Sequence, residues 1–178
     1  PKQNVFSTSG SLPAELGEPF NLPVNCRNTV KIARHCADLI GIEPSVRDGA
    51  PAGDDPEMLQ SPDFKAAFRL AAKKVNEWCM AGKGGLKPSQ VAVLVPSSEK
   101  ENCPEKFGSV PATLEFDAWR ADEGVLLSSA KRFKGLEADA VVIIHTPSDD
   151  PEAISVQYVA RSRAKHLLAV IEVEVSGD

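Results

Sequence analysis

The fold is decided by the stretch Ser128-Ser129-Ala130-Lys131-Arg132-Phe133-Lys134-Gly135-Leu136-Glu137, which joins two apolar runs at residues 125–127 and 140–144. Short, unbroken apolar runs are typical of strands that are covered on both faces of a sheet. The stretch between them predicts a basic loop, in which Gly135 permits a tight turn and Glu137 precedes the second strand. We therefore expect its hydroxyl, ammonium and carboxylate groups to lie together at the mouth of a sheet, where open α/β folds bind ligands.

A second basic stretch is Gln157-Tyr158-Val159-Ala160-Arg161-Ser162-Arg163-Ala164-Lys165. Asp150 and Pro151 are favourable starting residues for a helix over 152–161, which this stretch would end with three cations. The apolar run at 167–173 then predicts another strand. We expect the two basic stretches to be neighbours in space.

The rest of the chain predicts further helices and strands, with few hairpin signals. We expect a strand at 20–25, a helix that begins at Asn28 or Thr29 and ends before Gly41, a helix that opens at Ser61-Pro62 and stops at the glycines of 82–85, and strands at 91–95 and 112–116. This order favours a mainly parallel sheet in a three-layer α/β fold.

The composition predicts one globular domain of 178 residues with a net charge of −5. We assign 1–18 to an irregular lead-in and 19–178 to the domain, with a mobile acidic loop at about 43–62. Six carboxylates and four prolines lie between Glu43 and Asp63, with Arg47 as the only cation. The negative net charge argues against a domain that coats nucleic acid over its whole surface, but it does not exclude a local basic track.

Two further observations concern compartment and partners. No apolar run approaches the length that spans a bilayer, so we expect no membrane partner. The four cysteines form no C-x-x-C pair, which favours reduced thiols in a cytoplasmic protein and no metal site, with zinc or disulfides as the alternative.

The segments "RFKGLEADAVVI" and "QYVARSRAKHLLAVI" resemble motifs V and VI of the UvrD/Rep-type superfamily 1 helicases. The segment Leu22-Pro-Val-Asn25-Cys-Arg27-Asn-Thr29 is similar to motif IV of the same family. The three segments stand in the family's order. The resemblance implies a second RecA-like domain of the P-loop NTPase type.

The resemblance also implies roles at a nucleotide. The Arg of the family's T-R-A triplet falls on Arg163, which would be an arginine finger, and Arg27 would be a second phosphate contact. The family's K-G-L-E segment assigns Glu137 to the nucleotide sugar, with Gly135 in the turn before it. A guanidinium suits this work because its charge and donors are fixed. The alternative is that the cations of 161–165 complement a helix C-terminus.

A DNA contact is implied by the loop before K-G-L-E. The family's Thr-x-His is replaced here by Ser129 and Lys131, which keep a hydroxyl and a donor for a DNA phosphate. We expect single-stranded DNA to contact Ser128, Ser129, Lys131 and Lys134, and the alternative is a solvated loop. Arg161 stands where the family carries an apolar residue, and no role is transferred to it.

The sequence contains no Walker A loop and no Walker B Asp-Glu pair, and the Gly-Lys-Gly-Gly at 82–85 does not fit the phosphate-loop pattern. We expect ATP and Mg²⁺ to be bound mainly by an upstream first RecA-like domain of the same polypeptide, so that this chain alone is inactive. The resemblance implies the C-terminal motor domain of an ATP-dependent DNA helicase. The alternative is a degenerate RecA-like module that binds a partner or regulates an attached nuclease.

Overall fold

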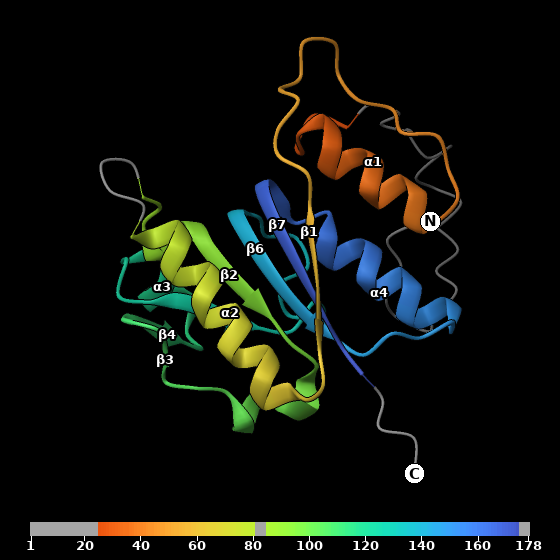
Figure 1. Ribbon diagram of the computed structural model, residues 1–178. Helices are drawn as coiled ribbons and strands as arrows, with labels where there is room; N and C mark the ends of the chain where they lie inside the picture. The colour runs from red at the N-terminus through yellow and green to blue at the C-terminus, as the bar shows by residue number, and fades with distance from the viewer. Residues whose placement is uncertain (1–24, 81–84, 175–178) are drawn as a thin grey trace, which may run out of the picture.

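The computed structural model describes residues 25–80 and 85–174 and contains a sheet of seven strands in the order β1-β7-β6-β2-β5-β4-β3 (Figure 1). All neighbouring strands are parallel except β3 and β4. The strands are β1 Glu57–Ser61, β2 Val91–Leu94, β3 Lys106–Phe107, β4 Val110–Thr113, β5 Val125–Ser128, β6 Ala138–His145 and β7 Ala164–Val173. The mainly parallel sheet predicted from the sequence is confirmed.

Helices cover both faces of the sheet. The helices are α1 Val30–Leu39, α2 Phe64–Cys79, α3 Phe116–Arg120 and α4 Pro151–Arg161, and the short 3₁₀ helices are η2 Pro88–Gln90 and η3 Ser97–Asn102. Alternate residues of β2 enter two cores: Val91 and Val93 pack with α2, whereas Ala92 and Leu94 pack with α1, α3 and α4. The result is the three-layer, RecA-like arrangement that was expected.

The predicted helix ends follow their local signals. Asp150 accepts a hydrogen bond from Ala153 N at 3.1 Å and caps α4, and Pro151 is the first helical residue. Asp63 caps α2 by accepting from Ala66 N at 2.6 Å. Gly41 follows α1 with φ of 63°, the left-handed conformation that commonly ends a helix.

The acidic loop expected at about 43–62 is wrong at its end, because residues Glu57–Ser61 form β1 and pair with β7. An edge strand of this kind is held by backbone pairing, and its exposed residues show no apolar alternation. The lead-in at 1–18 and the strand at 20–25 lie outside the described residues, except for Asn25, which forms a single parallel bridge with Val46.

The region after β2 also differs from the expectation. The strand predicted at 112–116 is β4, which begins at Val110, and Phe116 starts α3 instead. The β3–β4 hairpin was missed because its turn carries only Gly108, with φ of 65°, as a signal.

The basic loop 129–137 runs from one end of the parallel strands to the other. It begins at the carboxyl end of β5 and ends at the amino end of β6, and both strands run parallel to β2. Phe133 in the middle of the loop is fully buried and meets Trp119, with ring centroids 5.8 Å apart. The expectation that the hydroxyls, ammonium groups and carboxylate lie together is therefore wrong, since parallel strands require a crossover connection. We call the end of the sheet at which the parallel strands finish the carboxyl edge, and the end at which they begin the amino edge.

Candidate functional site

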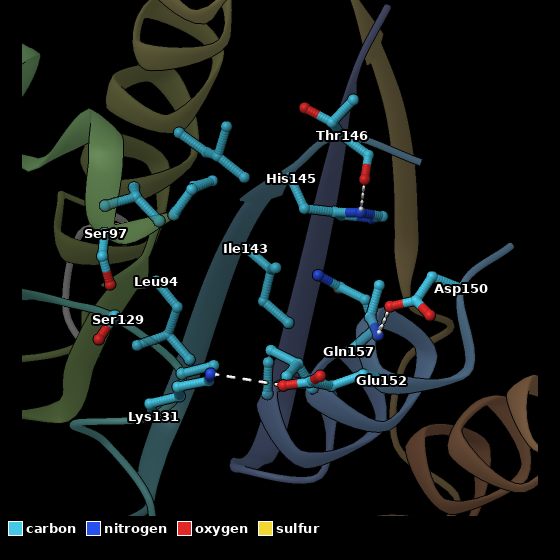
Figure 2. Close-up of a pocket in the computed structure, with 17 residues that line it drawn as sticks. Leu94, Ser97, Ser129, Lys131, Ile143, His145, Thr146, Asp150, Glu152 and Gln157 are labelled. Carbon is cyan, nitrogen blue, oxygen red and sulfur yellow. Dashed lines mark hydrogen bonds and ion pairs between the residues drawn. The ribbon is translucent and has the colours of Figure 1, made fainter. Parts of the chain in front are cut away.

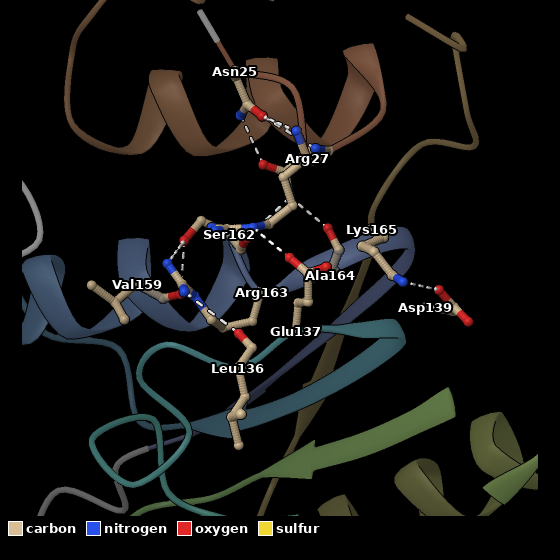
Figure 3. A network of polar contacts seen from close by, with 11 residues as sticks. Asn25, Arg27, Leu136, Glu137, Asp139, Val159, Ser162, Arg163, Ala164 and Lys165 are labelled. Carbon is tan, nitrogen blue, oxygen red and sulfur yellow. Dashed lines mark hydrogen bonds and ion pairs between the residues drawn. The ribbon is translucent and has the colours of Figure 1, made fainter. Parts of the chain in front are cut away.

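Three residues from distant parts of the chain gather at the amino edge (Figure 3). Arg27 precedes α1, Glu137 precedes β6 and Arg163 precedes β7. Arg27 Nε donates to Glu137 Oε2 at 2.8 Å, and both side chains are partly exposed, at 37% and 45%. Burial and the charge of Arg27 lower the pKa of Arg163, whereas Glu137 acts in the opposite direction. The residues assigned to the nucleotide thus form one electrostatic cluster.

Arg163 is bound to its own chain. Only 2% of the residue is exposed. Its guanidinium donates from Nε to Val159 O at 3.0 Å, from Nη2 to Ser162 Oγ at 3.1 Å and from Nη1 to Leu136 O at 3.5 Å. The contact with Val159 O fits the alternative interpretation that a cation complements the end of α4. The contact with Leu136 O joins the two basic stretches, which are neighbours as predicted.

Asn28 holds this cluster in place and was not identified as a site residue from the sequence. The residue is 5% exposed, and its Nδ2 donates to Ser162 O at 3.1 Å and to Ala164 O at 2.5 Å. Asn25 Oδ1 in turn accepts from the backbone N of Arg27 at 2.9 Å and from that of Asn28 at 3.1 Å. The turn that carries Arg27 is therefore fixed to the residues on either side of Arg163.

A cavity of about 450 Å³ lies at the carboxyl edge (Figure 2). It opens between the carboxyl ends of the neighbouring strands β2 and β6. The chain leaves these two strands in opposite directions along the sheet, because β2 is followed by β3 and β4 on one side and β6 is followed by β7 on the other. Such a topological switch point is where open α/β sheets bind ligands. Its polar lining includes Ser97, Ser129, Lys131, His145, Glu152 and Gln157.

The residues assigned to DNA occupy different positions in the basic loop. Ser129 and Lys131 line the cavity, and Lys131 Nζ lies 3.6 Å from Glu152 Oε1 in a half-exposed ion pair. Ser128 is fully buried, and its Oγ has no hydrogen-bond partner among the described residues. Lys134 is exposed further along the loop, and Gly135 has φ of 89°, which favours glycine. The structure thus brings Ser129 and Lys131 together at the cavity.

Arg161 is buried between the cavity and α1. Its Nη1 lies 2.9 Å from His35 Nε2, its Nη2 lies 3.3 Å from His145 Nε2, and Glu172 Oε1 lies 3.9 Å from Nη2. Burial, together with the charge of Arg161, lowers the pKa of both histidines. The only signal for this cluster in the sequence was a cation where the resembled family carries an apolar residue.

Residues 25–80 and 85–174 contain neither a candidate cluster of metal ligands nor a candidate membrane span. No group of three or more His, Cys, Asp or Glu side chains in these ranges could hold a metal ion. The four cysteines are free thiols, and burial raises the pKa of Cys36 to about 12. None of the helices in the same ranges is long and apolar enough to cross a bilayer.

The fold is shared with a known structure. The crystal structure of the C-terminal domain of a possible DNA helicase from Lactobacillus plantarum WCFS1 matches with a TM-score of 0.64 and 20% sequence identity. The match covers 83% of this chain and 87% of that chain. No family model matches the sequence, and a search of curated proteins finds no match.

Proposed function

We propose that this chain is the C-terminal motor domain of a UvrD-like, ATP-dependent DNA helicase. The observation that carries the proposal is the convergence of Arg27, Glu137 and Arg163 at one edge of the sheet. These residues come from the three segments that resemble motifs IV, V and VI. The fold is shared with the C-terminal domain of a possible DNA helicase, which supports the same proposal.

The amino-edge cluster would act on the phosphates of ATP. In phosphoryl transfer, negative charge spreads over the equatorial oxygens of the transferred group, and a guanidinium stabilises that charge. Arg27 is accessible and would exchange Glu137 for a phosphate, while Glu137 would turn to the sugar. ATP and Mg²⁺ would be held mainly by an upstream RecA-like domain, so that hydrolysis requires the two domains to close.

The carboxyl edge would carry part of the single-stranded DNA track. Ser129 and Lys131 would contact a DNA phosphate, with Lys134 further along the loop, whereas Ser128 is fully buried and has no surface to offer the strand. Helix α4 spans both sites, because Glu152 and Gln157 line the cavity and Arg163 follows its last turn. Differential contacts of ATP and its products would shift α4 and the loop, which would convert hydrolysis into a step along the strand.

Replacing Arg163 with Ala in the polypeptide that contains both domains tests this proposal. We expect DNA-stimulated ATP hydrolysis to fall by about 10³-fold, the scale of an arginine finger. Arg163→Lys should not restore it, because an ammonium cannot reproduce the guanidinium geometry. Arg120→Ala, at an exposed arginine of α3, is the matched control. Unchanged hydrolysis in folded Arg163→Ala protein would exclude the proposed role.

The second candidate is a degenerate RecA-like module that binds a partner or regulates an attached nuclease. The burial of Arg163 and its bonds to Val159, Ser162 and Leu136 favour it, since an arginine that serves only the fold would make such contacts. This candidate predicts no DNA-stimulated hydrolysis even in the complete wild-type polypeptide. The same assay therefore separates the two functions.

A further inference from the structure

A groove of about 680 Å³ lies on the α2 face, and none of its lining residues lines either site described above. Phe64, Phe68 and Ala72 of α2 are spaced four residues apart, so they line one side of the helix. Pro104, after η3, contributes apolar surface to the same groove. Phe68 is mostly buried in the core, whereas Phe64 and Ala72 remain partly accessible. We call this feature the α2 groove.

Cations surround the α2 groove. Lys65 and Arg69 of α2 and Lys106 of β3 line it, all three are exposed, and none has an ion pair among the described residues. Lys74 on the same helix differs, because it pairs with Glu57 at 2.7 Å and with Glu77 at 2.8 Å. The α2 groove therefore combines an apolar floor with an excess of positive charge, three cations against the carboxylate of Glu99, in a chain whose net charge is −5.

The groove also offers hydrogen-bond acceptors. Glu99 and Asn102 of η3 line it, and Glu99 Oε2 accepts from Asn102 Nδ2 at 3.2 Å. A peptide backbone presents N–H donors to such acceptors, whereas the sugar-phosphate backbone of DNA carries no hydrogen-bond donor. The combination of acceptors, apolar floor and cationic rim favours a peptide over a nucleic acid.

We propose that the α2 groove docks an acidic peptide segment of a partner protein, anchored by an aromatic or large aliphatic side chain. The anchor would lie on Phe64 and Phe68, and the flanking carboxylates would pair with Lys65, Arg69 and Lys106. Apolar anchors supply most of the affinity of such interfaces, and complementary charges supply specificity and association rate. The proposal does not depend on ATP or DNA binding, because no residue of the α2 groove belongs to either edge site.

The test uses the 178-residue chain and a fluorescein-labelled peptide in which one Trp is flanked on both sides by Glu. Fluorescence anisotropy should give saturable binding that weakens about tenfold in Arg69→Glu, because the peptide loses one charge pair and gains a repulsion. Phe64→Ala should weaken binding to a similar extent; because Phe64 is partly exposed but also packs against the core, circular dichroism must show that this variant is folded. The matched control is Lys73→Glu, an exposed lysine of the same helix outside the groove, which should change binding less than about twofold.

Three outcomes would overturn the proposal. The peptide fails to bind, or it binds wild type and Arg69→Glu equally, or an oligothymidine binds in an Arg69-dependent manner and the peptide does not displace it. The last result would assign the groove to nucleic acid. Replacing Trp by Gly in the peptide separates anchoring from simple charge attraction, because the proposal requires the Gly peptide to bind at least about fivefold more weakly.

Discussion

The amino edge and the carboxyl edge differ in how their polar side chains are bonded and in how much open space these side chains face. At the amino edge, Arg27, Glu137 and Arg163 are close together and are bonded to the protein itself. At the carboxyl edge, Ser129 and Lys131 line an open cavity of about 450 Å³, and the ion pair between Lys131 and Glu152 is long, at 3.6 Å. A ligand at the amino edge must replace existing contacts, whereas a ligand at the carboxyl edge can enter existing space. Under the proposed function, the amino edge would respond to the localised charge of a phosphate and the carboxyl edge to an extended DNA strand.

Removing the amide of Asn28 should have the largest effect on stability, because it would separate the elements of the amino edge. Asn28→Ala leaves the carbonyls of Ser162 and Ala164 without their buried donor. We expect the free energy of unfolding to fall by roughly 2–3 kcal/mol. Urea denaturation followed by circular dichroism measures it, and Asn102→Ala, at an exposed amide, should change it by less than about 0.5 kcal/mol. A similarly small loss in Asn28→Ala would show that the amino edge does not depend on this residue.

The buried histidines should make stability depend on pH at the carboxyl edge. The folded pKa of His145 is lowered by burial and by Arg161, while Thr146 O and Glu172 act in the opposite direction. Because the unfolded histidine binds protons first, stability is complete above pH of about 6.5 and falls as the pH drops below this value, by at most about 1.4 kcal/mol per pH unit for one histidine.

Arg161→Leu sharpens this prediction, since it removes the nearby positive charge and places the apolar residue of the resembled family there. The loss of stability on acidification should become smaller, although burial still opposes protonation. Urea titrations at a series of pH values between 5 and 8 follow both proteins. An equal or steeper loss in Arg161→Leu would show that its charge does not govern these histidines.

The smallest effect on stability is expected at Lys131. Its ion pair with Glu152 is half exposed, so Lys131→Ala should change the free energy of unfolding by less than about 0.5 kcal/mol. If Lys131 contacts a DNA phosphate, the variant should also reduce the salt dependence of oligothymidine binding by about one unit of slope. Lys73→Ala is the control for a simple loss of charge, because Lys73 belongs to α2, which covers the other face of the sheet from the basic loop. The same salt slope in Lys131→Ala and wild type would remove Lys131 from the DNA track.

The sequence predicted those parts of the fold that carry a periodic or capping signal. Helix α2 shows an apolar stripe, α4 follows Asp150 and begins with Pro151, and β2 and residues 140–144 of β6 are unbroken apolar runs. Strand β1 was missed because the segment is held as a strand by its backbone pairing with β7, and its own side chains show no strand pattern.

Some residues of the candidate site were predicted from the sequence and others were not, for a related reason. Arg27, Glu137 and Arg163 could be grouped through the resemblance to helicase motifs, whereas Asn28 and Arg161 could not. Their partners lie on other elements, and no local pattern records which backbone carbonyl or histidine will approach them. The separation of Ser129 from Glu137 follows from the direction of β5 and β6, which apolar runs alone do not specify.

The most direct test of separate roles for the amino edge and the carboxyl edge is a titration of ATP hydrolysis with oligothymidine, in a polypeptide that includes the proposed first RecA-like domain. We expect Arg163→Ala to lower the maximal rate without changing the DNA concentration for half-maximal stimulation. Lys131→Ala should raise that concentration by about threefold to tenfold and leave the maximal rate near that of wild type. If both substitutions change the same parameter to the same extent, the two edges do not have separate roles and the account is contradicted.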